Sequence, residues 1–203
     1  MKTLRQWAGL PPSQSIDPAT TALLLVDFQR EYFDGKLPLP MADGALAAVL
    51  PLLRAAERAG MTVVHVHHRA GSHGAPLFAP DSVGAEAVAA LTPAPDHLRV
   101  VKGLPSSFVG TGLEERLRER GCRTVIVTGL MTHNCVDATA RDALHRGFAV
   151  LVAGDACGTR DLPGAAGGQC VAAAALHEAV LAGLADRIAE VFSADQLVTM
   201  LAV

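Results

Sequence analysis

Short apolar runs rich in β-branched residues alternate along this chain with segments whose apolar residues recur at helical spacing. The runs lie at 22–26, 62–66, 99–101, 124–127, 149–153 and 188–192, and the helical patterns at 42–59, 111–120, 135–146, 169–184 and 194–201. The runs are apolar throughout instead of at every second position, which is typical of parallel strands buried on both faces. The alternation therefore predicts one doubly wound α/β domain over residues 1–203, whose first 19 residues form an N-terminal arm.

Two helix starts carry capping signals. Thr111 and Glu114 have the spacing of a capping box, and Gly121 follows the predicted helix at 111–120. Ser193 is placed to cap the last helix. These signals predict where the two helices begin.

Composition excludes several classes of protein. Half of the 203 residues are hydrophobic, and the net charge of −3 provides no basic field for nucleic acid or an anionic membrane. No apolar segment reaches the ~18 residues of a membrane span, and the first residues lack the apolar run of a secretory signal. We therefore expect a cytoplasmic protein whose partner is a small-molecule substrate. Cys122, Cys157 and Cys170 are expected to be small buried residues without disulfides.

Three reactive side chains fall at the carboxyl ends of predicted strands, where ligands bind in open parallel sheets. Asp27 and Lys102 end the first and third strands, and Cys135 stands where a helix begins after the fourth. A helix start favours thiolate over thiol, which makes Cys135 the candidate nucleophile. Asp27 can take the thiol proton and return it to a leaving nitrogen. The charge of Lys102 keeps Asp27 ionised and helps the thiolate to form.

Other residues near these ends are candidates for the substrate pocket. They are Phe28, Gln29 and Phe33 after the first strand, His68 after the second, Phe108 after the third, and Thr132 and Asn134 before the nucleophile. The aromatic residues could equally belong to the core, and Thr132 and Asn134 could only shape the turn. Thr139 and Asp142 are interpreted as structural residues of the helix. The irregular segment 69–96 is either a lid or interface element or a solvated insertion.

A cluster of histidines raises the possibility of a zinc site. It consists of His65, His67, His68 and His73. Imidazole is a common zinc ligand, but no carboxylate joins these side chains at a familiar ligand spacing. We therefore expect no metal, and interpret one or two of these histidines as residues that edge the pocket.

Four segments together resemble the isochorismatase-like cysteine hydrolases. They are LLLVDFQ, VVKGLPSSFVGTGLEERLRERG, VTGLMTHNCVDATARDA and VLVAGDACGT, in this order. The resemblance implies a three-layer α/β/α, Rossmann-like fold with a six-stranded parallel sheet, and a homodimer or homotetramer. It assigns catalysis to Asp27, Lys102 and Cys135. It also implies a cis peptide between Leu130 and Met131, with the N–H groups of Met131 and Cys135 forming an oxyanion hole.

The cysteine at the nucleophile position favours C–N hydrolysis over the vinyl ether cleavage of true isochorismatases. The resemblance thus implies a cysteine-dependent amidohydrolase that cleaves a small amide, carbamoyl or ureido substrate through a thioester, without a cofactor. One alternative is a zinc-assisted, nicotinamidase-like hydrolase, although His67 and Arg69 replace the Asp and His of the nicotinamidase D-x-H motif. The other is a small-molecule-binding protein that has lost turnover.

Overall fold

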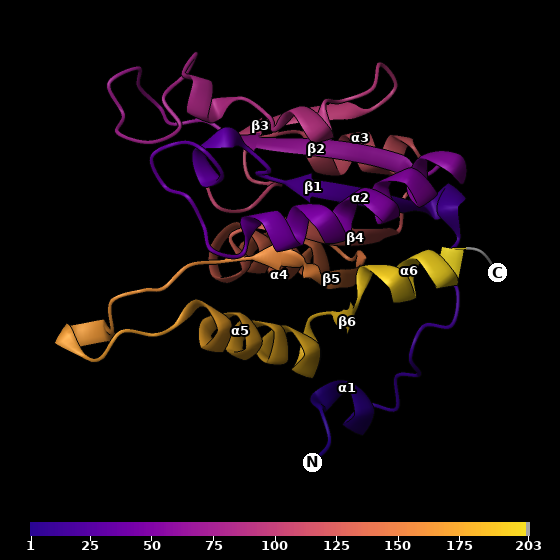
Figure 1. Ribbon diagram of the computed structural model, residues 1–203. Coiled ribbons are helices and arrows are strands. Elements are labelled where there is room, and N and C mark those ends of the chain that lie inside the picture. The colour runs from indigo at the N-terminus through magenta and orange to yellow at the C-terminus, as the bar shows by residue number, and fades with distance from the viewer. Residues whose placement is uncertain (202–203) are drawn as a thin grey trace.

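A six-stranded, all-parallel sheet forms the centre of the molecule, and the computed structural model describes residues 1–201 (Figure 1). The strands are β1 (Thr21–Val26), β2 (Thr62–His68), β3 (Leu98–Lys102), β4 (Thr124–Leu130), β5 (Ala149–Gly158) and β6 (Glu190–Phe192). Their order across the sheet is β3-β2-β1-β4-β5-β6. The predicted three-layer fold with six parallel strands is confirmed.

Helices cover both faces of the sheet (Figure 1). The helices of the described chain are α1 (Leu4–Trp7), α2 (Ala42–Arg58), α3 (Leu113–Glu119), α4 (Asp137–His145), α5 (Ala173–Arg187) and α6 (Ala194–Leu201), of which α1 packs against α5 and covers neither face of the sheet. Short 3-10 turns lie at Pro18–Thr20, Arg30–Tyr32, Val83–Ala85, Ala89–Leu91 and Ala165–Gly167, and a π-helical turn at Thr132–Val136 precedes α4. Helices α2 and α6 pack on one face, and α3, α4 and α5 on the other.

The two layers explain why the strands have no polar alternation. In β1, Leu23 and Leu25 belong to the hydrophobic cluster beneath α2 and α6. Leu24 and Val26 face the cluster beneath α3, α4 and α5. Every residue of β1 is buried, so side chains of both orientations are removed from water.

The beginning of α3 differs from the prediction. The helix starts at Leu113 after Gly112, whose φ of 66° is left-handed, so the capping box expected from Thr111 and Glu114 does not form. The Thr111 hydroxyl donates to the Ser107 carbonyl at 2.7 Å, and Glu114 pairs with Arg146. Glu114 thus has a distant partner in place of the local cap, whereas Thr111 bonds within its own loop and also accepts from the Leu113 N–H at 3.3 Å.

The beginning of α6 agrees with the prediction. The Ser193 hydroxyl accepts from the Gln196 N–H at 3.2 Å, and the Gln196 side chain accepts from the Ser193 N–H at 2.8 Å. The cap predicted for Ser193 is confirmed, and the reciprocal bond makes it a capping box.

Strands β1 and β4 approach closely at their carboxyl ends. Val26 pairs with Gly129, which has a φ of 130°. A Cβ atom on Gly129 would lie 2.0 Å from the Val26 carbonyl oxygen. Only glycine fits this position, which precedes the chain segment that carries Cys135.

Two segments extend beyond the layers. The N-terminal arm lies against its own chain: the Leu4 N–H donates to Asp186 on α5, and Ser13 bonds to Glu190 on β6. Residues 161–172, here called the projecting arm, form a narrow loop that stands out from the body (Figure 1). It is closed by a bridge between Leu162 and Val171.

No helix within residues 1–201 is long and apolar enough to cross a membrane.

Candidate active site

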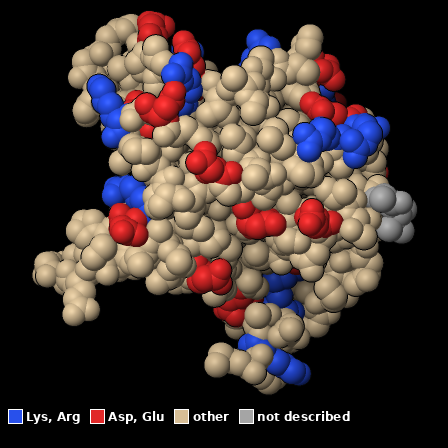
Figure 2. All heavy atoms as spheres, in the orientation of Figure 1, with Lys and Arg blue, Asp and Glu red and all other residues tan. Residues whose placement is uncertain are grey.

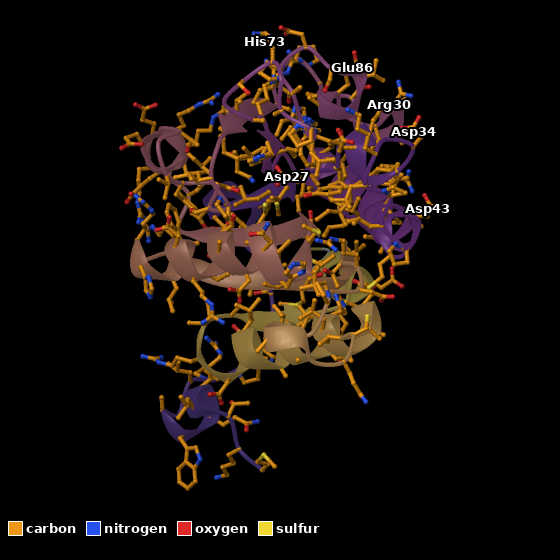
Figure 3. The ribbon with its side chains drawn as sticks, turned by 90° about the vertical axis from the view of Figure 1, so that its left-hand side faces the viewer. Asp27, Arg30, Asp34, Asp43, His73 and Glu86 are labelled. Atoms are coloured by element: carbon orange, nitrogen blue, oxygen red, sulfur yellow. The ribbon has the colours of Figure 1, made fainter. Side chains whose placement is uncertain are left out.

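The carboxyl ends of the central strands bring the three predicted reactive residues together. Asp27 directly follows β1, Lys102 is the last residue of β3, and Cys135 lies in the π-helical turn between β4 and α4. Their exposed fractions are 0%, 2% and 4%. Figure 3 shows Asp27 in the interior, whereas the charged side chains of Arg30 and Glu86 reach the periphery.

Lys102 joins the other two side chains. Its Nζ lies 2.8 Å from Asp27 Oδ2 and donates to Cys135 Sγ at 3.1 Å. Apart from the ion pair, neither carboxylate oxygen of Asp27 has a hydrogen-bond partner among residues 1–201. Buried carboxylates ordinarily use most of their lone pairs. Those of Asp27 remain free to accept a proton.

The thiol of Cys135 is protonated in the resting site. Burial raises its pKa to about 12, and the Asp27 carboxylate adds to the rise, while Lys102 opposes it. Desolvation and the neighbouring negative charge therefore outweigh the helix start and Lys102, which both favour the thiolate. Burial alone would lower the pKa of Lys102. Asp27 and Cys135 raise this pKa by more than burial lowers it, so the net pKa lies above its usual value and the ammonium keeps its charge.

The turn that carries the nucleophile is tied to elements far away in the sequence. The peptide between Leu130 and Met131 is cis, as the family resemblance implies. Thr132 Oγ1 lies 2.9 Å from Nδ1 of His177 on α5, and His133 Nδ1 bonds to Thr159 Oγ1 after β5. These ties fix the orientation of the turn.

A cavity of about 310 Å³ has Cys135 in its wall. Its lining consists of Tyr32, Leu37, His68, Leu77, Phe78, Pro105, Met131, Asn134, Cys135 and Arg160. His68 and Asn134 thus lie where the sequence analysis placed them. The walls are mainly apolar, and the polar groups gather at His68, Asn134 and Arg160.

The three expected pocket residues that follow β1 lie outside the cavity. Phe28 is buried in the hydrophobic cluster beneath α2, and Phe33 packs against that cluster. The Gln29 side chain is fully buried: its amide donates to the carbonyls of His68 and Ala85, and its oxygen accepts from the His68 N–H at 2.7 Å. Gln29 therefore fixes the end of β2 instead of facing substrate.

Two further expectations are also corrected. Phe108 packs on Phe148, with 5.8 Å between ring centroids, because its loop folds onto α4 instead of over the cavity. Thr132 is fully buried and directed to His177. The sequence left two alternatives open for each residue. Phe108 belongs to the core and does not line the pocket, and Thr132 shapes the turn and does not face the cavity.

Most of the cavity wall was not predicted from the sequence. Leu77 and Phe78 come from the irregular segment 69–96, and Phe78 packs edge-on against Tyr32, with 5.0 Å between centroids. Segment 69–96 therefore supplies one wall. Arg160 follows β5, so the rule that pointed to Asp27 and Lys102 could have found it.

Arg160 brings a guanidinium group to the cavity. Its Nη1 donates to the Asp161 carbonyl at 3.1 Å, and its Nε is buried without a hydrogen-bond partner among the described residues. The Nδ1 atom of His68, on the same cavity, is likewise buried and unpartnered. Both atoms retain hydrogen-bonding capacity for a bound molecule.

Comparison with known proteins decides the family. A model of the isochorismatase domain matches residues 21–196. The chain belongs to the isochorismatase family. It is 37% identical to the secreted isochorismatase effector of Verticillium dahliae, over 92% of this chain and 94% of the relative. It is 31% identical to a ureidoacrylate amidohydrolase of Methylorubrum extorquens, over 72% of this chain and 73% of the relative.

The solved structure of a cysteine hydrolase from Pseudomonas syringae pv. phaseolicola has the same fold, with a TM-score of 0.87 at 28% identity. The similarity covers 94% of this chain and 97% of that one. The isochorismatase-family relatives are hydrolases and amidohydrolases, and this chain is a hydrolase of the family.

In this isochorismatase-family hydrolase the four clustered histidines do not converge on one point. His65 bonds to His97 at 3.0 Å beneath α2, and burial lowers the pKa of His65 to about 3. The ring of His67 lies edge-on to that of His65, with 6.5 Å between centroids, and burial lowers the pKa of His67 as well. His68 faces the cavity, and His73 is exposed near Asp81. Within residues 1–201, no group of three or more His, Cys, Asp or Glu side chains is arranged to hold a metal ion.

Proposed function

We propose that this hydrolase is a cysteine-dependent amidohydrolase that cleaves the C–N bond of a small amide, carbamoyl or ureido compound. The observation that carries the proposal is the contact of Lys102 Nζ with both the Asp27 carboxylate and the Cys135 sulfur. This arrangement places a nucleophile, a proton acceptor and a cation within one buried site beside a cavity. The ureidoacrylate amidohydrolase among its relatives supports C–N hydrolysis.

Acylation begins with transfer of the thiol proton from Cys135 to Asp27 as Sγ attacks the substrate carbonyl carbon. The raised pKa of the thiol makes a base necessary, because little free thiolate exists near neutral pH. The N–H groups of Met131 and Cys135 bind the oxyanion of the tetrahedral intermediate. Asp27 then gives its proton to the leaving nitrogen, the C–N bond breaks, and a thioester remains.

Deacylation uses the same groups in reverse. Asp27 takes a proton from water as the water oxygen attacks the thioester carbonyl. The C–S bond breaks, the acid leaves, and the proton returns to Cys135 Sγ. Lys102 remains an ammonium throughout and stabilises the negative charge as it moves between Asp27 and the sulfur.

The cavity favours a small substrate with a negatively charged group. A volume of about 310 Å³ is near the lower limit for small-molecule pockets. The unpartnered Nε of Arg160 is suited to a carboxylate, which guanidinium groups bind with charge-assisted hydrogen bonds. We therefore propose a carbamoyl or ureido acid whose carbonyl reaches Cys135 while its carboxylate faces Arg160.

A substrate screen with active-site variants tests the function. The screen covers carbamoylated amino acids, ureido acids, nicotinamide and aryl amides, with release of ammonia or amine as the readout. With the best substrate, Cys135→Ala is expected to lose turnover, and acid quenching of the wild-type reaction is expected to trap a thioester on Cys135 that mass spectrometry detects. Full amidase activity in Cys135→Ala would exclude the mechanism. Loss of wild-type turnover in a chelator, restored by zinc, would favour the zinc-assisted alternative.

A further inference from the structure

Lys102 reaches Cys135 from a strand that is not adjacent to β4. Strand β3 is at the edge of the sheet, and β2 and β1 lie between it and β4. Three strand spacings of ~4.8 Å separate the backbones of β3 and β4 by roughly 14 Å. The sheet alone therefore does not hold the Lys102 ammonium against the Cys135 sulfur.

The segment after Lys102 is fastened directly to the helical run that carries Cys135. The Ser107 N–H donates to Thr139 Oγ1 at 3.0 Å, and the two hydroxyl oxygens lie 2.9 Å apart. Thr139 stands four residues after Cys135, about one helical turn further along. Ser107 and Thr139 both have exposed fractions of 0%. We call this pair of hydrogen bonds the hydroxyl clasp.

Further bonds surround the clasp. The Ser106 hydroxyl donates to Asp142 on α4 at 2.6 Å and accepts from the Phe108 N–H at 3.1 Å. The Thr111 hydroxyl donates to the Ser107 carbonyl. Residues 103–112 form no regular helix or strand, so these side-chain bonds replace a backbone ladder over this segment.

We propose that Ser107 and Thr139 are positioning residues that hold the Lys102 ammonium against the Cys135 sulfur. The segment then meets the Cys135 helix at two points, the Lys102–Cys135 contact and the clasp one turn beyond it. Removal of the Thr139 hydroxyl leaves the Ser107 N–H and hydroxyl buried without partners, which favours withdrawal of the segment from α4. Lys102 withdraws with it. The effect on turnover rests on the proposed function, whereas the effect on the thiol does not.

The test measures the reactivity of Cys135 without a substrate. Iodoacetamide alkylation of Cys135 is followed by peptide mass spectrometry between pH 7 and 9 in wild type, Thr139→Val, Ser107→Ala and Thr139→Ser. Thr139→Val is expected to alkylate more slowly at each pH, because the cation that favours thiolate has moved away. Ser107→Ala loses the hydroxyl pair but keeps the N–H bond to Thr139, so it is expected to be slowed less. Thr139→Ser keeps the hydroxyl and is expected to match wild type. With a verified substrate, kcat is expected to fall about tenfold in Thr139→Val.

A variant that lacks the Asp27–Lys102 ion pair shows whether the clasp acts through Lys102. In the double variant Asp27→Asn/Lys102→Gln, the ion pair is removed without leaving one buried charge unpaired. Addition of Thr139→Val to this background is expected to leave the alkylation rate unchanged. Thr199→Val is the matched control, since the Thr199 hydroxyl donates to a helix carbonyl on α6, away from the site.

The outcomes are distinct. An alkylation profile in folded Thr139→Val equal to that of wild type overturns the proposal, and so does an equal slowing in the Asp27→Asn/Lys102→Gln background. If Thr139→Val does not fold, Ser107→Ala decides by the same criterion. A slowed alkylation in an enzyme that turns over no amide supports the clasp and counts only against the proposed function.

Discussion

At the scale of single residues, the site holds a neutral arrangement of one carboxylate, one ammonium and one thiol. Asp27, Lys102 and Cys135 are buried, and Lys102 contacts both of the others. Asp27 therefore has two opposing effects on the nucleophile in the proposed mechanism: it raises the pKa of the thiol at rest, and it accepts the thiol proton during attack. The two effects can be separated by removing the charge of Asp27.

Asp27→Asn is expected to make Cys135 more reactive towards iodoacetamide while it abolishes turnover. The substitution removes the negative charge that raises the pKa of the thiol, and the cation of Lys102 remains. Alkylation is measured at fixed pH with Cys135→Ala as the blank. Slower alkylation in a folded Asp27→Asn protein would show that Asp27 does not oppose the resting thiolate.

Arg160→Gln is expected to raise KM at least about tenfold for a carboxylate-bearing substrate, because hydrogen bonds to charged groups contribute ~1.5–3 kcal/mol. The KM for the corresponding uncharged methyl ester is expected to change little. Arg160→Lys, which keeps the charge, serves as the matched control. Equal effects on the acid and its ester would contradict carboxylate recognition by Arg160.

The sequence predicts the three reactive residues better than it predicts the residues that line the cavity. Asp27 and Lys102 could be found because strand ends are readable from apolar runs. The protonation of Cys135 could not, because burial of the sulfur depends on the packing of segments distant in the chain. The position of Phe108 likewise depends on how the loop after β3 folds onto α4.

At the scale of elements, the geometry at the strand ends depends on the close approach of β1 and β4. Gly129 pairs with Val26 immediately before the turn that carries Cys135. The strand runs could be predicted, but this contact could not, since it requires knowing which strands are neighbours. The start of α3 was mispredicted for a related reason: Glu114 has a distant partner in Arg146.

Gly129→Ala is expected to destabilise the protein by at least about 2 kcal/mol, through a methyl group forced against the Val26 carbonyl and a φ of 130°. Gly183→Ala on α5 is the matched control, because its Cβ would meet nothing within 4 Å. It is expected to be neutral or to stabilise by up to about 1 kcal/mol. Chemical denaturation measures both, and similar stabilities for the two variants would contradict the role of Gly129.

At the scale of the whole molecule, charged side chains and buried thiols are unevenly distributed. Asp161 is the one charged residue of the projecting arm. Residues 162–176 contain no charged side chain, and the outer part of the arm lacks blue and red in Figure 2. Its Cys170 is exposed, contrary to the expectation of a buried residue, because the arm stands away from the core. The other cysteines, Cys122, Cys135 and Cys157, are buried, and burial raises the pKa of each thiol.

The buried thiols predict a loss of stability at alkaline pH. An unfolded thiol deprotonates near pH 9, whereas Cys135 and Cys157 stay protonated up to about pH 12 when folded. Above pH 9 the unfolded state binds fewer protons, so the free energy of unfolding falls by up to about 1.4 kcal/mol per pH unit and thiol. Denaturation at pH 8 to 11 measures this slope. Cys157→Ala should flatten it, and an unchanged slope would contradict the assignment.

We also propose that the protein is a homodimer or homotetramer whose contacts include the projecting arm. The arm is rooted in the site, since Arg160 precedes it and His177, bonded to Thr132, follows it. Replacement of residues 163–170 by a short glycine–serine turn is expected to lower the molar mass measured by light scattering. An unchanged mass would remove the arm from the interface, and a monomeric wild type would refute the oligomer.

Burial of Cys135 has a consequence for the lifetime of the enzyme. In the native state the sulfur is shielded and protonated, so ordinary oxidants find little thiolate to attack. Partial unfolding returns this cysteine to the acidity of a free thiol, because the sulfur comes into contact with water and the Asp27 carboxylate, which follows another strand, separates from it. A conformation that opens briefly is thus more vulnerable to oxidation than the native enzyme. The rate of irreversible inactivation in air should therefore measure how often the sheet opens at the carboxyl ends of its strands.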